Sequence, residues 1–163
     1  MPLLQAIEQT FSNLNEPTIE TMKAAILTLD NLLAATPTYM TEPTFLPYGR
    51  NVVFSGKELE VIVIHIPANR ATSIHNHGLS IGTAYVVEGS LINTTFTLDL
   101  EGYPLTEHDN LIQAGQCIEA PAGQIHQLSN PFHERAISLH VYSPPLRSVK
   151  RYLTYCETLD FSI

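Results

Sequence analysis

Apolar residues recur at helical spacing over the first part of the chain. The two runs are Leu3, Leu4, Ile7, Phe11 and Leu14, and then Ile19, Met22, Ala25, Ile26, Leu29 and Leu33. The segment 15–18 separates them, and its Pro17 suits a break followed by a new helix start. A stripe of this kind buries one face of a helix against a core. The pattern therefore predicts that residues 1–40 form a helical cover packed on the rest of the protein.

From about residue 45 the pattern changes to short β-prone runs separated by glycine and proline. The runs span residues 50–54, 59–66, 81–87, 91–98, 116–120, 125–129 and 136–142, with a further candidate at 151–156. Many short strands at even spacing are typical of an antiparallel sandwich or a barrel. No strand is assigned between Leu98 and Gly115. We predict one mainly β domain over residues 1–163, with the barrel at residues 45–156.

Composition and charge exclude several classes of partner. The chain has 163 residues, of which 44% are hydrophobic and 15% charged, and its net charge is −8. Nucleic-acid binding is not expected of so acidic a chain, in which only Arg147, Lys150 and Arg151 gather positive charge. No apolar run is long enough to span a membrane, and no secretory signal is recognisable. We expect a cytoplasmic protein, and its oligomeric state stays open, a monomer included.

Two linked patterns bring histidines together. The first is His75-Asn76-His77, and the second reads Gly-x5-Pro-x-Gly-x2-His-x3-Asn, starting at Gly115 and containing His126. Alternate residues of a strand face the same side, so His75 and His77 can both point inward. Three imidazoles at one point form a metal site, and imidazole suits iron, zinc, copper and nickel. The other context-free histidines, His65, His108 and His133, are interpreted as structural or surface residues.

A third stretch, Ser138-x-His140-x-Tyr142, places polar residues at alternate positions of one predicted strand. All three can therefore share the interior of the barrel, where polar groups need hydrogen-bond partners. Upstream, Tyr48-x-Arg50 precedes another predicted strand. A guanidinium group binds a carboxylate through two parallel hydrogen bonds, which makes Arg50 a candidate for an anionic substrate.

The two histidine patterns resemble the paired motifs of the cupin superfamily, a double-stranded β-helix or jelly-roll barrel. The Ser-His-Tyr run with the following Ser143-Pro144-Pro145, together with Tyr48-x-Arg50-Asn51, resembles the cysteine dioxygenase type I family of thiol dioxygenases, in a bacterial form. This resemblance implies Fe(II) held by His75, His77 and His126. L-cysteine would bind by its thiolate and amine, with its carboxylate on Arg50 and Tyr48, and O2 would convert it to cysteine sulfinate.

The same resemblance assigns roles to the residues around the metal. It implies that Tyr142 lies beside the bound substrate and O2, and that His140 and Ser138 form a hydrogen-bonded relay behind it. It also implies a cis peptide bond at Ser143-Pro144. Many cupins carry a carboxylate ligand where this chain has Gly82, and animal members of the family carry a cysteine there that crosslinks to the tyrosine. We therefore expect a metal with neutral ligands only, ready for a thiolate, and a free Tyr142 phenol.

Three other functions stay open. A dioxygenase of 3-mercaptopropionate or a similar mercaptocarboxylate would use the same site. Related enzymes that prefer that substrate usually have glutamine in place of Arg50, which favours cysteine here. A non-catalytic cupin that binds a small ligand and a zinc or nickel cupin acting as a hydrolase or isomerase are the remaining alternatives.

Overall fold

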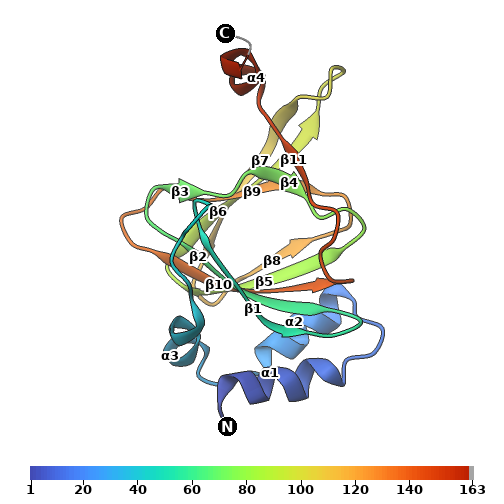
Figure 1. Ribbon diagram of the computed structural model, residues 1–163, viewed down its shortest axis with the longest axis vertical. Coiled ribbons are helices and arrows are strands. Elements are labelled where there is room, and N and C mark those ends of the chain that lie inside the picture. Colours follow the sequence, from blue (N-terminus) through green and yellow to red (C-terminus); the bar gives the residue numbers. More distant parts are fainter. Residues whose placement is uncertain (162–163) are drawn as a thin grey trace.

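Two antiparallel sheets face each other and form the body of the protein (Figure 1). The computed structural model describes residues 1–161, the last two of them by their backbone alone. The first sheet has the order β1 (Gly49–Ser55), β2 (Glu60–Ile66), β10 (Ala136–Ser143), β5 (Ile81–Glu88) and β8 (Cys117–Ala120). The second has the order β11 (Lys150–Tyr152), β4 (Ile74–Asn76), β9 (Ile125–Asn130), β6 (Ser90–Leu98) and β7 (Pro104–Gln113), with β3 (Arg70–Ala71) beside β9.

The central strands β2 and β10 of the first sheet are buried on both faces. All seven residues of β2 and all eight of β10 are buried. In β2, Val61 and Val63 face an outer core under the helices, while Ile62 and Ile64 face an inner core between the sheets. The same alternation in β10 sends Leu139 outward and its polar residues inward. This period of two decides which side chains reach the interior of the barrel.

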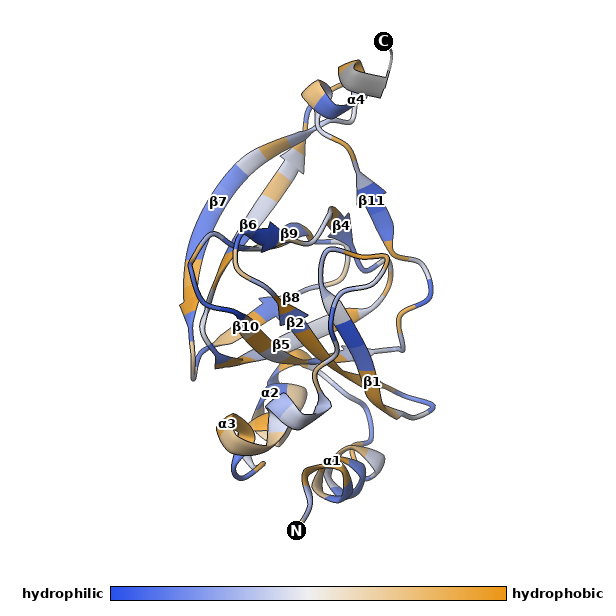
Figure 2. Cartoon of the chain, turned by 60° about the vertical axis from the view of Figure 1, so that its left-hand side comes forward, coloured by the Kyte–Doolittle hydropathy of each residue, from blue (hydrophilic) through white to orange (hydrophobic). Residues whose placement is uncertain are grey.

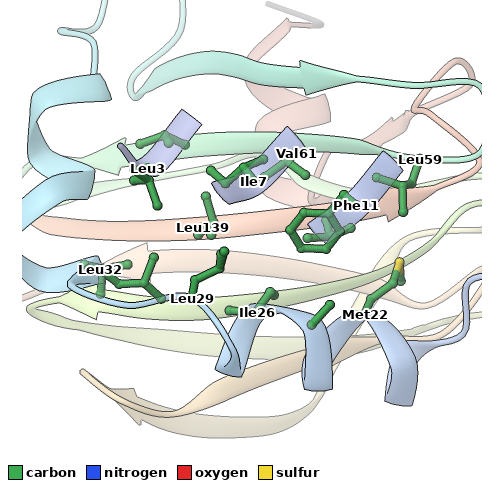
Figure 3. Packing of buried hydrophobic residues seen from close by; sticks show 14 of the residues in the cluster. Leu3, Ile7, Phe11, Met22, Ile26, Leu29, Leu32, Leu59, Val61 and Leu139 are labelled. Carbon is green, nitrogen blue, oxygen red and sulfur yellow. The ribbon is translucent and has the colours of Figure 1, made fainter. Parts of the chain in front are cut away.

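The predicted helical cover is present on the outer face of the first sheet (Figures 1 and 3). It consists of α1 (Leu3–Ser12), α2 (Ile19–Leu27), α3 (Leu32–Ala35) and the 3-10 helix η1 (Thr36–Tyr39). Leu3, Ile7 and Phe11 of α1 and Met22 of α2 pack against the sheet. The α2 start is capped, because the Thr18 hydroxyl accepts a hydrogen bond from the backbone N–H of Thr21 at 3.1 Å.

The apolar pattern predicted more helical, core-facing positions than the structure has. Leu14 lies beyond α1, which ends at Ser12, and Leu33 is 64% exposed although it shares the periodicity of α2. Helix α2 ends at Leu27 and a separate helix, α3, begins at Leu32. The spacing of apolar residues continues across this break, but the two segments are not one helix. Periodicity reports which residues could share a face, and the intervening turn decides which of them do.

Three other strand assignments differ from prediction. The unassigned stretch forms β7, which pairs along β6 in a long hairpin that projects from the barrel (Figure 2). Most residues of β7 are exposed, so it lacks the apolar alternation that marks a strand. The two short strands β3 and β4 were not predicted.

Among the helices in the described part of the chain, none is long and apolar enough to cross a bilayer.

The predicted strand at residues 151–156 is correct only at its start. Strand β11 ends at Tyr152 and helix α4 (Tyr155–Phe161) follows. Thr154 caps this helix, because its hydroxyl accepts from the Glu157 N–H while the Glu157 carboxylate accepts from the Thr154 N–H, both at 3.1 Å. This Thr-x-x-Glu pair is a capping box, a signal in the sequence that the β-prone composition of the segment concealed.

Candidate metal centre

Three histidines converge between the two sheets. His75 lies on β4, His77 follows the end of that strand, and His126 lies on β9 directly opposite His75. Their ring centroids are 4.8 to 5.0 Å apart, and their candidate ligand atoms all lie within 4.8 Å of one another. His77 and His126 are almost fully buried. The structure therefore brings the three predicted ligands to one point.

Hydrogen bonds orient two of these rings. His75 donates from Nδ1 to the carbonyl oxygen of Ser73 at 2.7 Å, and His126 donates from Nδ1 to Oδ1 of Asn93 at 2.9 Å. A proton on Nδ1 leaves Nε2 with a free lone pair in each ring. Nε2 of His75 lies 3.1 Å from Nε2 of His77. The unpartnered Nε2 of His126 faces the same point, and a set of neutral imidazole nitrogens of this kind fits a metal ion.

Burial keeps these imidazoles neutral. It lowers the pKa of His77 to about 3, with the neighbouring His75 adding to the effect. Burial also lowers the pKa of His126 well below its usual value. Nε2 of His126 is buried and has no hydrogen-bond partner among the described residues. Metal ligands must be deprotonated, so these rings would bind a cation at neutral pH without releasing protons.

Asp and Glu are absent from the ligand group in the part of the chain whose side chains the structure describes. Three neutral ligands would leave the full charge of a divalent cation uncompensated. Such a cation lowers the pKa of a bound thiol and favours an anionic sulfur donor. The arrangement can therefore present an electrophilic metal face to an anionic ligand.

A buried hydrogen-bonded chain lies beside the histidines. On β10, the Ser138 hydroxyl is 2.7 Å from Nε2 of His140, and Nδ1 of His140 is 2.9 Å from the Tyr142 hydroxyl. The Tyr142 ring centroid lies 4.7 Å from that of His77. Burial raises the pKa of Tyr142 and lowers that of His140 to about 3, so both groups are neutral at pH 7. In a neutral chain of this kind, each hydrogen bond can run in either direction, because His140 can carry its proton on Nδ1 or on Nε2.

The histidines open into a cavity of about 350 Å³. Its lining residues include Tyr48, Arg50, His140, Tyr142, Arg147 and Arg151. Arg50, at the start of β1, lies 3.9 Å from the carboxylate of Glu60 on β2. Ile62, Ile64 and Leu128 supply apolar walls. The cavity is open to solvent and combines the three histidines, a phenol and several guanidinium groups.

Comparison with known proteins places the chain in a family. The family model described as "Cysteine dioxygenase type I" matches residues 44–154, which is more than half of the chain. The chain belongs to the cysteine dioxygenase type I family. A relative in zebrafish (Danio rerio), "Cysteine dioxygenase type 1", is 30% identical over 120 residues, which cover 69% of this chain and 56% of the relative. The chain thus spans little more than half the length of that relative.

Solved structures confirm the cupin fold. A protein with a double-stranded β-helix domain from Klebsiella pneumoniae aligns with a TM-score of 0.61 and 20% identity, over 73% of this chain and 95% of its own. A protein from Bacillus halodurans gives a TM-score of 0.60 and 16% identity, over 81% and 92% of the two chains. A cupin-2 domain protein from Rhodospirillum rubrum gives 0.55 and 13%, over 75% and 76%. The predicted fold class, a mainly β cupin with N-terminal helices, is therefore correct.

Gly82 explains how the family tyrosine fits without a crosslink. Gly82 pairs with Tyr142 across β5 and β10, and a Cβ atom at Gly82 would lie 2.6 Å from Cε1 of the Tyr142 ring. The ring therefore lies against bare backbone. Gly82 has no side chain that could bond covalently to the Tyr142 ring.

We expect Gly82→Ala to disturb the tyrosine without touching the metal ligands. The added methyl group forces the Tyr142 ring to move, which stretches its 2.9 Å contact with His140. Overpacking of this kind destabilises a protein by about 1–3 kcal/mol. Thermal unfolding should show that loss, with iron content unchanged. A variant of wild-type stability would mean that the Tyr142 ring moves aside freely.

Sequence reasoning missed two arginines that line this cavity, Arg147 and Arg151, and one acid beside Arg50, Glu60. Glu60 is buried in the apolar strand β2 and also accepts a hydrogen bond from the backbone N–H of Leu146 at 2.9 Å. A lone acid in an otherwise apolar run was the available signal. Arg147 and Arg151 come from the segment after the Ser143-Pro144 bond, which is cis. The clustering of those arginines was visible in the sequence, but their position at the cavity with the three histidines was not.

The three remaining histidines lie outside the cavity. His65 is buried and donates from Nδ1 to the carbonyl oxygen of Thr41 at 3.0 Å, while His108 and His133 are exposed. Cys117 is partly buried on β8 and Cys156 is exposed, and both are free thiols. The three histidines thus occupy structural or surface positions, as predicted.

Proposed function

We propose that the protein is an Fe(II)-dependent thiol dioxygenase that converts L-cysteine and O2 to cysteine sulfinate. Both oxygen atoms go to sulfur, and the thiol proton is retained in the sulfinic acid, so the reaction balances without another reductant. One observation carries the proposal: three neutral histidines without a carboxylate ligand face a cavity that contains Arg50 and Tyr142, in a chain of this family. When bound at the three histidines, Fe(II) would supply the redox chemistry that O2 requires.

Arg50 would hold the substrate carboxylate. Its guanidinium group can form two parallel hydrogen bonds to a carboxylate, and the nearby Glu60 restrains its position from the adjacent strand. Tyr48 lies on the same wall and can add a hydroxyl contact. Anchoring the carboxylate there turns the thiol toward the histidines, which contributes to catalysis by positioning.

Tyr142 would act where the thiol and O2 meet. Its hydroxyl group stays protonated because burial raises its pKa, so it can donate a hydrogen bond to developing negative charge. His140 and Ser138 fix the direction of that hydroxyl group through the contacts of 2.9 and 2.7 Å. These residues orient a donor and can exchange a proton, and they need not bind the metal.

The decisive experiment is O2 consumption after anaerobic loading with Fe(II). With cysteine, O2 uptake and a product heavier by two oxygen atoms are expected. The same assay with 3-mercaptopropionate decides between substrates, because it lacks only the amine and would reverse the ranking with a much higher kcat/KM. Iron-loaded protein that consumes no O2 with either thiol would favour a ligand-binding cupin. Native zinc or nickel with no response to iron would favour the hydrolase or isomerase.

Replacing Arg50 with alanine should weaken cysteine binding. Loss of a charged hydrogen-bonding partner costs about 1.5–3 kcal/mol, equivalent to roughly a 10- to 100-fold rise in KM. Iron content should not change, because Arg50 is not a ligand. Arg135→Ala is the matched control, since Arg135 pairs with Glu88 on the surface at 2.7 Å. An unchanged KM in Arg50→Ala would remove this residue from the substrate site.

A further inference from the structure

The cysteine-binding scheme proposed above leaves two guanidinium groups at the cavity without a role. Arg147 and Arg151 line the same space as Arg50 and the histidines. Neither forms an ion pair or a hydrogen bond with any side chain in the part of the chain that the structure describes. Arg50, by contrast, has Glu60 nearby. Arg147 and Arg151 are both exposed, so the open side of the cavity carries positive charge that no side chain in the described part of the chain neutralises.

Strand register aims Arg151 at the metal-binding wall. Strand β11 pairs antiparallel with β4, and Arg151 lies directly opposite the candidate ligand His75. Residues directly opposite in an antiparallel pair project from the same face of the sheet. Burial is the main cause of the lowered pKa of His75, and the positive charge of Arg151 lowers it further. Lys150 and Tyr152, the neighbours of Arg151, project to the other face.

Arg50 and Arg151 approach the histidines from opposite walls. Arg50 belongs to β1, an edge strand of the first sheet, and Arg151 to β11, an edge strand of the second. Arg147 lies in the segment that connects β10 to β11 and joins Arg151 at the cavity. A substrate anchored by one carboxylate on Arg50 would leave this second positive wall empty. A cavity of about 350 Å³ also has room for a ligand larger than cysteine.

We propose that Arg147 and Arg151 form a second anion subsite, which binds the second acidic group of a small thiol carrying two carboxylates. This inference rests on the thiol dioxygenase function proposed above and specifies its substrate class. One carboxylate would lie on Arg50 and the other on Arg147 and Arg151, with the thiol directed at the histidines between them. Binding through two separated anchors fixes orientation better than one anchor does.

The rival explanation is electrostatic steering. In a chain of net charge −8, positive residues at the cavity could draw in any anionic thiol without contacting it. Steering raises kcat/KM for mono- and dicarboxylate thiols together and weakens as salt is added. A subsite changes the ratio between the two substrates. The ratio of kcat/KM for the dicarboxylate and monocarboxylate thiols therefore distinguishes direct binding by the arginines from electrostatic steering.

Mercaptosuccinate and 3-mercaptopropionate are suitable probes, because they differ by one carboxylate. We expect wild-type iron-loaded protein to prefer mercaptosuccinate in kcat/KM at constant ionic strength. In Arg151→Gln this preference should fall roughly 10-fold, the effect of losing one charged hydrogen bond. Lys150→Gln is the matched control, with the same change of net charge on the same strand but on the opposite face. It should keep the wild-type ratio. Arg147→Gln tests the subsite independently if Arg151→Gln is poorly folded.

A binding measurement without turnover makes the test independent of activity. Succinate should raise the thermal unfolding temperature of the protein without added iron more than propionate does at equal ionic strength. That difference should disappear in Arg151→Gln and persist in Lys150→Gln. If no thiol is oxidised but the succinate effect holds, the dioxygenase function fails while the anion subsite stands.

Other outcomes overturn the subsite. Equal loss of kcat/KM for both thiols in Arg151→Gln would mean steering alone. No preference for mercaptosuccinate in the wild type, or an unchanged ratio in both arginine variants, would also refute it. So would equal stabilisation by succinate and propionate.

Discussion

His126→Ala should abolish iron binding and O2 consumption together. His126 is the most deeply buried of the three candidate ligands and the one held by a side-chain hydrogen bond, to Asn93 at 2.9 Å. Without it, two imidazoles remain, and both come from one short segment of the chain. We expect activity below detection, since the proposed chemistry depends on the metal. Iron content by elemental analysis and O2 uptake by electrode measure the two effects separately.

A graded comparison tests how the site is built. Asn93→Ala keeps all three imidazoles but removes the acceptor that fixes the tautomer of His126. Loss of such a supporting contact typically weakens metal binding by about 10- to 100-fold. His108→Ala, at an exposed position on the β6–β7 hairpin, should change neither iron content nor activity. Stoichiometric iron and full turnover in His126→Ala would refute the assigned metal site.

The sequence predicts the interior of this barrel better than its periphery. Strands β2 and β10 carry apolar residues in strict alternation with the groups that line the cavity, so Ser138, His140 and Tyr142 could be placed on one face in advance. The histidines could be grouped because their motifs match a known family. In both cases, local spacing and the geometry of a strand are enough to fix direction.

Charged residues around the cavity were harder to predict, because their roles depend on contacts between distant segments. Glu60 is brought near Arg50 by the pairing of β1 with β2, and Arg151 reaches His75 through the pairing of β11 with β4. The local sequence of residues 147–151 does not indicate that Arg151 pairs with His75. The β6–β7 hairpin was missed for another reason, since an exposed strand has no core side to reveal its period.

Tyr142→Phe should lower kcat while leaving iron in place. The substitution removes one hydroxyl group from a buried position and retains the ring that packs 4.7 Å from His77. If the phenol donates a hydrogen bond or a proton at the reacting sulfur and oxygen atoms, its loss should reduce kcat by about 10²-fold or more. KM for cysteine should change less, because in the proposed binding mode the carboxylate lies on Arg50, which belongs to another strand. Single-turnover and steady-state O2 uptake would measure the effect.

Two further variants separate the chemistry of the phenol from simple packing. Tyr85→Phe makes the same change on the outer face of β5, beside the helical cover, and should leave kcat unaltered. Ser138→Ala keeps the phenol but removes the far end of the chain, leaving Nε2 of His140 without its 2.7 Å partner. If His140 works by orienting Tyr142, kcat in Ser138→Ala should fall less than in Tyr142→Phe, and combining the two changes should add little. Fully additive losses would mean that the three residues act separately, and wild-type kinetics in Tyr142→Phe would exclude the phenol from catalysis.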